Sequence, residues 1–164
     1  MDLVTVTLSG GRRVRVLTVL DRYTREGVAV RAGHRFPAEL AAAVLDEAVG
    51  ERGKPAAVRV GGGPEFAGRT LDLWAYRWGV ALDFSRPGKP TDGAFSESFN
   101  GRLREECLNT HRFLCLDDVP QATTSWRENY NRKRPQSALG HRTPEEFVAQ
   151  QVGEMKTNPT DPSA

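Results

Sequence analysis

One stretch of the chain places a carboxylate, an amide and a guanidinium at helical spacing. Glu97 precedes Arg104 by seven residues and Asn100 lies between them, so a helix here would carry all three side chains on one face. The same stretch contains several apolar side chains, namely Phe95, Phe99, Leu103 and Leu108. This pattern favours a helix that packs its apolar side on a core and turns its polar side toward an anionic ligand. An ordinary amphipathic surface helix would show the same pattern.

Two other places along the chain could contribute to a site with Glu97. Asp2 begins a stretch of alternating polar and apolar residues, and three consecutive glycines at 61–63 follow a short apolar run. Asp2 could supply a second carboxylate, whereas glycine supplies no side-chain oxygen. A shared site therefore requires a fold that brings these two places to Glu97.

Three strands are predicted first, over residues 3–8, 14–20 and 27–31. All three are rich in β-branched residues, and short polar turns separate them. The second is apolar enough to be a central strand. Short connections favour an antiparallel arrangement of the three.

Helical periodicity then alternates with short strands. The further predicted elements are a helix from Pro37 to Gly50, a strand at 57–60, a helix at 70–78, a strand at 80–84, a helix after Ala94, a long helix at 118–132 and a short helix from Thr143. Prolines and glycines predict a loop at 87–93, before the helix that carries Glu97. One folded domain is expected over residues 1–150, followed by a disordered, polar and proline-rich tail over 151–164.

This order of elements predicts an α/β protein of the ribonuclease-H-like class. Three antiparallel strands followed by two helix-linked strands would form a mixed five-stranded sheet with helices on both faces. In that arrangement, carboxylates from the first strand, the end of the fourth strand and a later helix converge. Asp2, the glycine cluster and Glu97 occupy these three places.

The composition describes a soluble globular protein in a reducing compartment. Hydrophobic residues make up 38% of the 164 residues and charged residues 27%, and no apolar run approaches the ~20 residues of a membrane span. The start of the chain lacks the pattern of a signal peptide. Cys107 and Cys115 form no metal-binding motif, which suits the cytoplasm and argues against structural zinc. The net charge of +2 does not by itself indicate a nucleic-acid ligand, although basic clusters occur at residues 12–15 and 132–134.

Several longer motifs point to a known family. They are M-D-L-V, L-T-V-L-D-R-Y-T-R-E, G-P-E-F, R-P-G-K-P-T-D-G-A-F-S-E-S-F-N-G-R-L-R-E-E-C-L-N, W-R-E-N-Y-N-R-K-R-P-Q-S-A-L-G and T-P-E-E-F. From about residue 2 to residue 149, the chain resembles the integrase-type catalytic core of bacterial insertion-sequence transposases of the copy-out/paste-in kind. These proteins are relatives of retroviral integrases.

The resemblance implies an activity and a metal. The activity would be that of a DDE polynucleotidyl transferase, which cuts and joins DNA strands with two Mg²⁺ or Mn²⁺ ions held by carboxylates. The resemblance places the first Asp on Asp2, the final Glu on Glu97 and the accompanying basic residue on Arg104. Where the family has its middle Asp, this chain has Gly61.

The glycine predicts an impaired enzyme. Asp2 and Glu97 could hold at most one ion well, so the second ion would lack a ligand. Glu65 is not expected to substitute, because it already has its own place in the G-P-E-F motif, four residues away.

The resemblance also implies DNA as the partner and self-association in a synaptic complex, with no membrane and no small-molecule substrate. The residues expected at DNA are Lys89, Asn100, Arg104, Arg132, Lys133 and Arg134. For residues 132–134 the alternative is a helix C-terminus that positive charge stabilises. For Lys89 the alternative is a plain solvated side chain.

Three functions remain open at this point. The chain is a transposase core for DNA cleavage and strand transfer with lost or reduced activity, a non-catalytic DNA-binding or assembly module (a remnant or a competitor), or a nuclease that works with one metal ion. Members of the family carry helical, DNA-recognising segments before the core, so truncation at the N-terminus is a further expectation. Asp21 lies in a family motif and is expected to act in a turn, not as a metal ligand.

Overall fold

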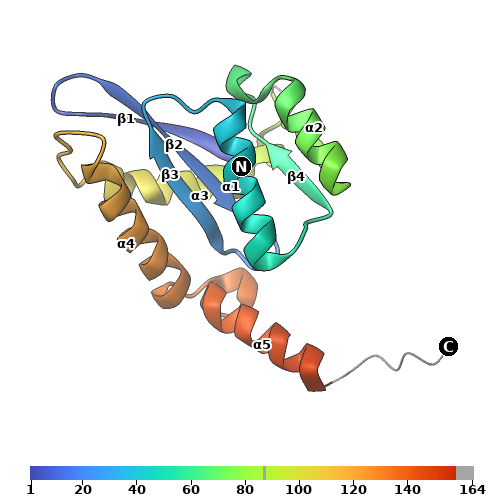
Figure 1. Cartoon of the computed structure of the whole chain (residues 1–164). Coiled ribbons are helices and arrows are strands. Elements are labelled where there is room, and N and C mark those ends of the chain that lie inside the picture. Colours follow the sequence, from blue (N-terminus) through green and yellow to red (C-terminus); the bar gives the residue numbers. More distant parts are fainter. Residues whose placement is uncertain (87, 158–164) are drawn as a thin grey trace.

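The computed structural model describes residues 1–86 and 88–157. Two layers of helices enclose β-structure (Figure 1). The helices α1 and α2 lie side by side on one face, and α3 and α4 lie on the other. The predicted class, with helices on both faces, is confirmed.

Three antiparallel strands form the larger sheet, as predicted. They are β1 (Asp2–Thr7), β2 (Arg13–Leu20) and β3 (Gly27–Gly33), and β2 lies in the centre. Asp2 pairs with Thr18 in the register of β1 and β2. The smaller sheet consists of β4 (Ala57–Val60) and β5 (Ala81–Phe84), which are parallel.

The predicted continuous five-stranded sheet is divided into these three-stranded and two-stranded sheets. Met1 joins them. Its amino group donates to the carbonyl oxygen of Arg59 (2.5 Å), and its carbonyl oxygen accepts from the backbone N–H of Gly61 (2.9 Å). This link sets Asp2, the next residue of β1, beside the end of β4.

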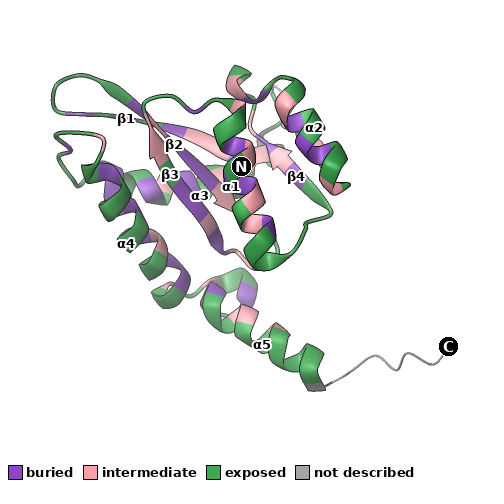
Figure 2. Cartoon of the chain, in the orientation of Figure 1, coloured by how far each residue is buried: buried purple, intermediate pink, exposed green. Residues whose placement is uncertain are grey.

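Alternate residues of the larger sheet enter two separate cores. Buried residues lie along the three strands, whereas α4 and α5 are largely exposed (Figure 2). Leu17 and Ala29 pack with α1 (Ala38–Arg52) and α2 (Arg69–Trp78). The opposite side chains pack with α3 (Pro90–Leu103) and α4 (Asp118–Lys133), and they include Val4, Val14, Val16 and Val30. The central strand β2 is buried on both faces at residues 16–18, which explains its apolar run, whereas Thr5 and Thr7 of β1 are exposed.

Phe99 is the central side chain of the second core. It is 1% exposed, and its ring makes edge contacts with Trp126 and Tyr130 at centroid distances of 5.2 and 4.9 Å. A Cβ atom at Gly27 would lie 2.9 Å from Phe99 Cζ, so the strand can approach the ring only with glycine at this position.

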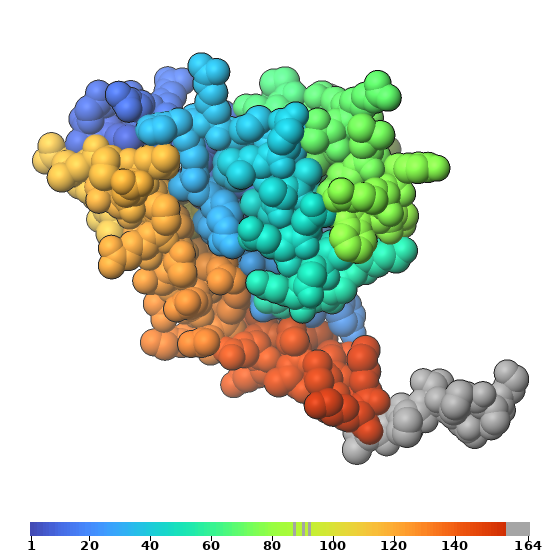
Figure 3. Space-filling view, viewed as in Figure 1, coloured from blue at the N-terminus to red at the C-terminus, as the bar shows by residue number. Residues whose placement is uncertain are grey.

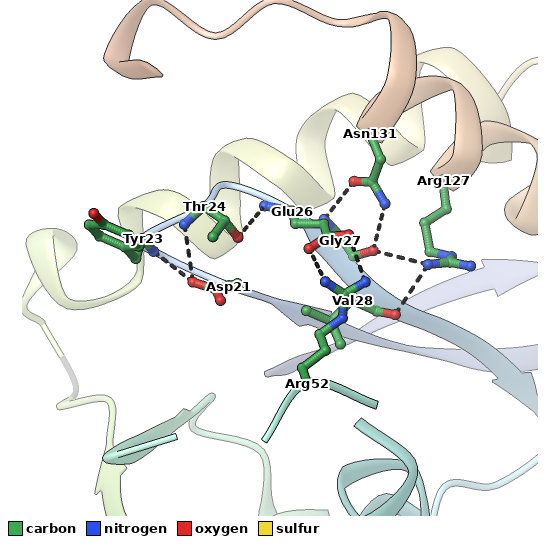
Figure 4. A network of polar contacts seen from close by, with 9 residues as sticks. All are labelled: Asp21, Tyr23, Thr24, Glu26, Gly27, Val28, Arg52, Arg127 and Asn131. Atoms are coloured by element: carbon green, nitrogen blue, oxygen red, sulfur yellow. Dashed lines mark hydrogen bonds and ion pairs between the residues drawn. The ribbon is translucent and has the colours of Figure 1, made fainter. Parts of the chain in front are cut away.

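Helix α4 also covers the open edge of β3 (Figure 4). The Asn131 amide donates to the carbonyl oxygen of Gly27 (3.0 Å) and accepts from its N–H (2.9 Å). Arg127 donates to the carbonyl oxygens of Gly27 and Val28, each at 3.2 Å. Side chains therefore satisfy backbone groups that would otherwise stay unpaired at a sheet edge.

The boundaries of three helices differ from the prediction. Helix α1 continues through Gly50 to Arg52, and Gly53, with φ 83°, ends it. Helix α3 begins at Pro90 and not after Ala94, because proline is tolerated in a first helical turn and Gly93 continues the helix. The last helix, α5 (Pro144–Thr157), extends beyond the predicted domain end at 150, so residues 151–157 are helical and not a disordered tail. Residues 158–164 lie outside the described residues.

Three short elements complete the fold. They are the 3₁₀ turns Pro64–Phe66 and Ser137–Leu139 and a π-helical turn at Arg104–Leu108, which continues α3. Helix α5 packs against α4 and extends from the lower edge of the molecule (Figure 3). Within residues 1–86 and 88–157, no helix combines the length and the apolar character that crossing a membrane requires.

Candidate active site

A cleft of about 390 Å³ lies where the two sheets meet. Its walls come from the start of β1, the turn after β4, the loop after β5 and the first turns of α3. The lining residues are Met1, Asp2, Arg59, Gly61, Gly62, Ser85, Arg86, Gly88, Lys89, Gly93, Ser96 and Glu97. The structure thus brings Asp2, Gly61, Lys89 and Glu97 together.

Two hydrogen bonds fix the carboxylate of Asp2. Its Oδ1 accepts from the backbone N–H of Leu3 (2.8 Å), and its Oδ2 accepts from Asn100 Nδ2 (2.9 Å). Asn100 Oδ1 in turn accepts from the hydroxyl of Thr18 (2.8 Å). Asn100 is 4% exposed and Thr18 is 3% exposed. Asn100 therefore orients Asp2 from beneath and is not open to a DNA backbone.

Gly61 leaves space that Asp2 occupies. A Cβ atom at this position would lie 2.4 Å from Asp2 Oδ1 and 3.1 Å from Asp2 Cγ. Any other residue here would have to displace the Asp2 carboxylate. Burial lowers the pKa of the neighbouring Met1 amino group to about 6, and the charge of Asp2 partly offsets this effect.

Glu97 reaches the cleft from the second turn of α3. Its side chain folds back over Gly93, where a Cβ atom would lie 3.1 Å from Glu97 Oε1. Among residues 1–86 and 88–157, no group of three His, Cys, Asp or Glu side chains is placed to hold a metal ion. Among the side chains that the structure describes, two carboxylates line the cleft, those of Asp2 and Glu97.

Glu65 is directed away from this cleft. Its Oε1 forms an ion pair with Arg15 Nη2 (2.5 Å), and Arg15 also donates to the hydroxyl of Thr5 (3.2 Å). Glu65 Oε2 points toward Gly63, where a Cβ atom would lie 2.6 Å away. Glu65 is not among the cleft residues, which agrees with the expectation that it does not substitute for the missing Asp.

Two of the predicted basic residues near the site are exposed. Lys89 lines the cleft. Arg104 is the first residue of the π-helical turn and is not among the cleft residues. Arg104 therefore lies beyond the cleft, in the π-helical turn that continues the helix of Glu97.

The basic cluster at 132–134 is largely paired within the chain. Arg132 forms an exposed ion pair with Glu145 (3.3 Å), and Arg134 pairs with Glu106 beside Tyr130. Lys133 is exposed at the end of α4. These pairs leave less positive charge at this helix end than the sequence suggests.

The polar chain beneath Asp2 was not predicted. Thr18 carried one available signal, because it is a polar residue inside the apolar run of the central strand, V-L-T-V-L. The turn role predicted for Asp21 is confirmed, since its Oδ1 accepts from the backbone N–H groups of Tyr23 (2.8 Å) and Thr24 (3.2 Å), as Figure 4 shows.

Comparisons with known proteins extend these observations. Two family models, each described as an integrase core domain, match residues 1–90 and residues 78–144. The chain is 47% identical, over 149 residues, to a 31.7 kDa protein of the insertion element IS407 from Burkholderia multivorans. It is 40% identical, over 149 residues, to a 39.2 kDa protein of the insertion element IS476 from Xanthomonas euvesicatoria.

These matches cover most of this chain and about half of the relatives. The matched region is 91% of the chain in both cases, but 54% of the IS407 protein and 43% of the IS476 protein. Among solved structures, the HTLV-2 integrase catalytic core domain in complex with magnesium, in a trimeric form, matches with a TM-score of 0.68 and 14% identity. That match covers 89% of this chain and 91% of the integrase chain, and it shows a shared fold.

Proposed function

Because the chain belongs to the integrase core domain family of insertion-sequence transposases, we propose that it is a core built for DNA cleavage and strand transfer whose catalytic step is impaired. The observation that supports this proposal is the composition of the cleft. Asp2 and Glu97 line it together, and Gly61 stands against the Asp2 carboxylate, at the position to which the motif resemblance assigns an Asp. The proposed ligand is DNA, with element ends and target as substrates, and the proposed place of action is the bacterial cytoplasm.

The donor set fits one divalent ion better than two. Asp2 and Glu97 are the residues that would hold Mg²⁺ or Mn²⁺, since such ions prefer carboxylate oxygens. A bound ion would supply electrostatic stabilisation of charge on a phosphoryl oxygen. A second ion would find no side-chain ligand at Gly61. Asn100 and Thr18 would keep the Asp2 carboxylate oriented toward the ion.

Lys89 and Arg104 have different proposed roles. Lys89 stands at the cleft and would contact a phosphate near the reacting bond. Arg104, beyond the cleft, would contact the DNA backbone farther along the strand.

A second candidate function is a non-catalytic DNA-binding or assembly module. The missing third carboxylate favours it, because a protein that binds DNA and self-associates without reacting would compete with an intact transposase. The trimeric form of the HTLV-2 integrase core supports self-association of this fold, and for this chain it remains part of the proposal.

A cleavage assay separates these functions. The parent protein, the Glu97→Gln variant and the Gly61→Asp variant are incubated with a labelled DNA duplex in the presence of Mg²⁺ or EDTA. We expect the parent to bind DNA without cleaving it and the Gly61→Asp variant to gain Mg²⁺-dependent nicking. Cleavage by the parent that Glu97→Gln abolishes would contradict the proposed impairment and favour the one-metal nuclease. Absence of DNA binding by the parent would contradict both candidate functions.

A further inference from the structure

The connection between β2 and β3 presents two arginines at the side of helix α3. The guanidinium carbon of Arg25 lies 3.6 Å from the centroid of the Phe95 ring, and that of Arg22 lies 5.1 Å from it. Phe95 is 39% exposed, so the ring is a surface feature that carries two cations. We call Arg22, Arg25 and Phe95 the arginine–phenylalanine cluster.

The backbone of Arg25 is in a conformation that arginine rarely adopts. Its φ of 60° lies in the left-handed region, where glycine or asparagine would be less strained. The backbone conformation therefore does not favour arginine here, and a role for the arginine side chain explains its presence better. Arg25 Nη1 is also buried without a hydrogen-bond partner.

The charges of the two arginines are not balanced within the described part of the chain. Neither Arg22 nor Arg25 forms an ion pair there, whereas Arg132 and Arg134 pair with Glu145 and Glu106. Burial and the neighbouring charge of Arg22 lower the pKa of Arg25. Two adjacent cations on a ring favour an anion between or above them, because the anion relieves their mutual repulsion.

The cluster adjoins the active cleft. Phe95 directly precedes Ser96 and Glu97, which line the cleft. Arg22, Phe95 and Ser96 line a neighbouring depression of about 340 Å³, which shares Met1, Arg59 and Ser96 with the cleft. A nucleic-acid strand that passes from Glu97 over this depression would thus meet Arg22, with Arg25 on the same Phe95 ring.

We propose that Arg22 and Arg25 bind a phosphodiester group of the DNA strand on the α3 side of the cleft, and that Phe95 holds both guanidinium groups in place for it. This inference rests on the proposed function, since it names the surface by which the same site would hold DNA. It moves the expected DNA contact from residues 132–134 to the β2–β3 connection. Forked guanidinium donors suit phosphate oxygens, and a ring contact reduces the freedom that they lose on binding.

The test compares two double variants of equal charge. Arg22→Gln/Arg25→Gln removes the proposed contacts, and Arg12→Gln/Arg13→Gln removes two exposed arginines at the β1–β2 turn, at the other end of β1 from Asp2. Binding to a fluorescein-labelled DNA duplex is measured by anisotropy in EDTA at several salt concentrations. Thermal melting of each variant confirms that it folds.

We expect the Arg22/Arg25 variant to bind DNA about 10-fold or more weakly than the parent. The slope of log K against log salt concentration should be smaller in magnitude by about 1 to 2. The Arg12/Arg13 variant should lose no more than about 2-fold, as expected for a general change of charge. A Phe95→Leu variant should have a DNA affinity between those of the two double variants, because it keeps both arginine charges but removes the ring that holds them.

Equal losses in the two double variants would overturn the inference and leave the proposed function intact, since charge alone would then explain binding. Failure of the parent protein to bind the duplex would overturn the proposed function and the inference with it. A normal affinity in the Arg22/Arg25 variant would refute the cluster as a contact while the parent still binds DNA.

Discussion

Replacing Gly61 by Asp should destabilise the metal-free protein and make its stability depend on Mg²⁺. The new Cβ atom would lie 2.4 Å from Asp2 Oδ1, so this oxygen must move by about 1 Å to reach ordinary contact distance. The movement breaks the 2.8 Å hydrogen bond from the Leu3 N–H, and losing a hydrogen bond to a charged group costs about 1.5–3 kcal/mol. Two carboxylates about 4 Å apart add a repulsion of up to about 4 kcal/mol, which protonation of one of them limits.

A net loss of about 3 kcal/mol in the free energy of unfolding is therefore expected in EDTA, which lowers the melting temperature by about 6–12 °C for a chain of this size. Mg²⁺ at about ten times its dissociation constant should restore about 1.4 kcal/mol, because it binds the folded state alone. Circular dichroism melting in EDTA and in millimolar Mg²⁺ measures both quantities.

Gly61→Asn is the matched control, because it has nearly the same shape and no charge. It should show the steric part of the loss and no response to Mg²⁺ beyond that of the parent. If the Asp variant melts with the Asn variant in EDTA, or if Mg²⁺ raises both equally, the carboxylates do not meet at this point and the reasoning fails.

Two further predictions concern buried groups. Asn100→Ala should lower the free energy of unfolding by about 2–3 kcal/mol, because Asp2 Oδ2 loses its hydrogen-bond donor and the Thr18 hydroxyl keeps only the longer contact to the Asp2 carbonyl oxygen (3.4 Å). Urea unfolding of the Asn100→Ala/Thr18→Val double variant checks this chain of contacts. Non-additive losses would confirm it, and full additivity would contradict it. Burial raises the pKa of Cys107 to about 11, so its thiol stays neutral at pH 8 and should resist iodoacetamide, whereas the exposed Cys115 should react. Mass spectrometry that finds Cys107 modified in the folded protein would refute this prediction.

The sequence predicted the elements that hydrophobic periodicity defines. Three antiparallel strands, the parallel pair and the helices on both faces all follow from patterns of apolar residues and short connections. The grouping of Asp2, the glycine cluster and Glu97 around one cleft also agrees with the predicted order of elements.

Long-range contacts account for what the sequence did not reveal. Asn100 shares a helical stripe with Glu97, but only the depth of α3 against β2 decides that its amide is buried under Asp2. Arg132 and Arg134 read as a basic patch until folding brings Glu145 and Glu106 beside them. Gly50 is a strong local signal for a helix end, but packing continues α1 through it. Pro90 is a strong local signal for a loop, but the first turn of α3 accommodates it.

Met1 links two sheets whose ends meet at the candidate active site. Asp2 belongs to the three-stranded sheet, whereas Gly61 directly follows β4 of the two-stranded sheet. A small rotation of one sheet against the other would stretch both Met1 hydrogen bonds and spare the ladders inside each sheet, although the core that holds Leu17 and Val60 would resist it. The amide proton of Gly61 is therefore the natural reporter of cleft opening in hydrogen-exchange NMR.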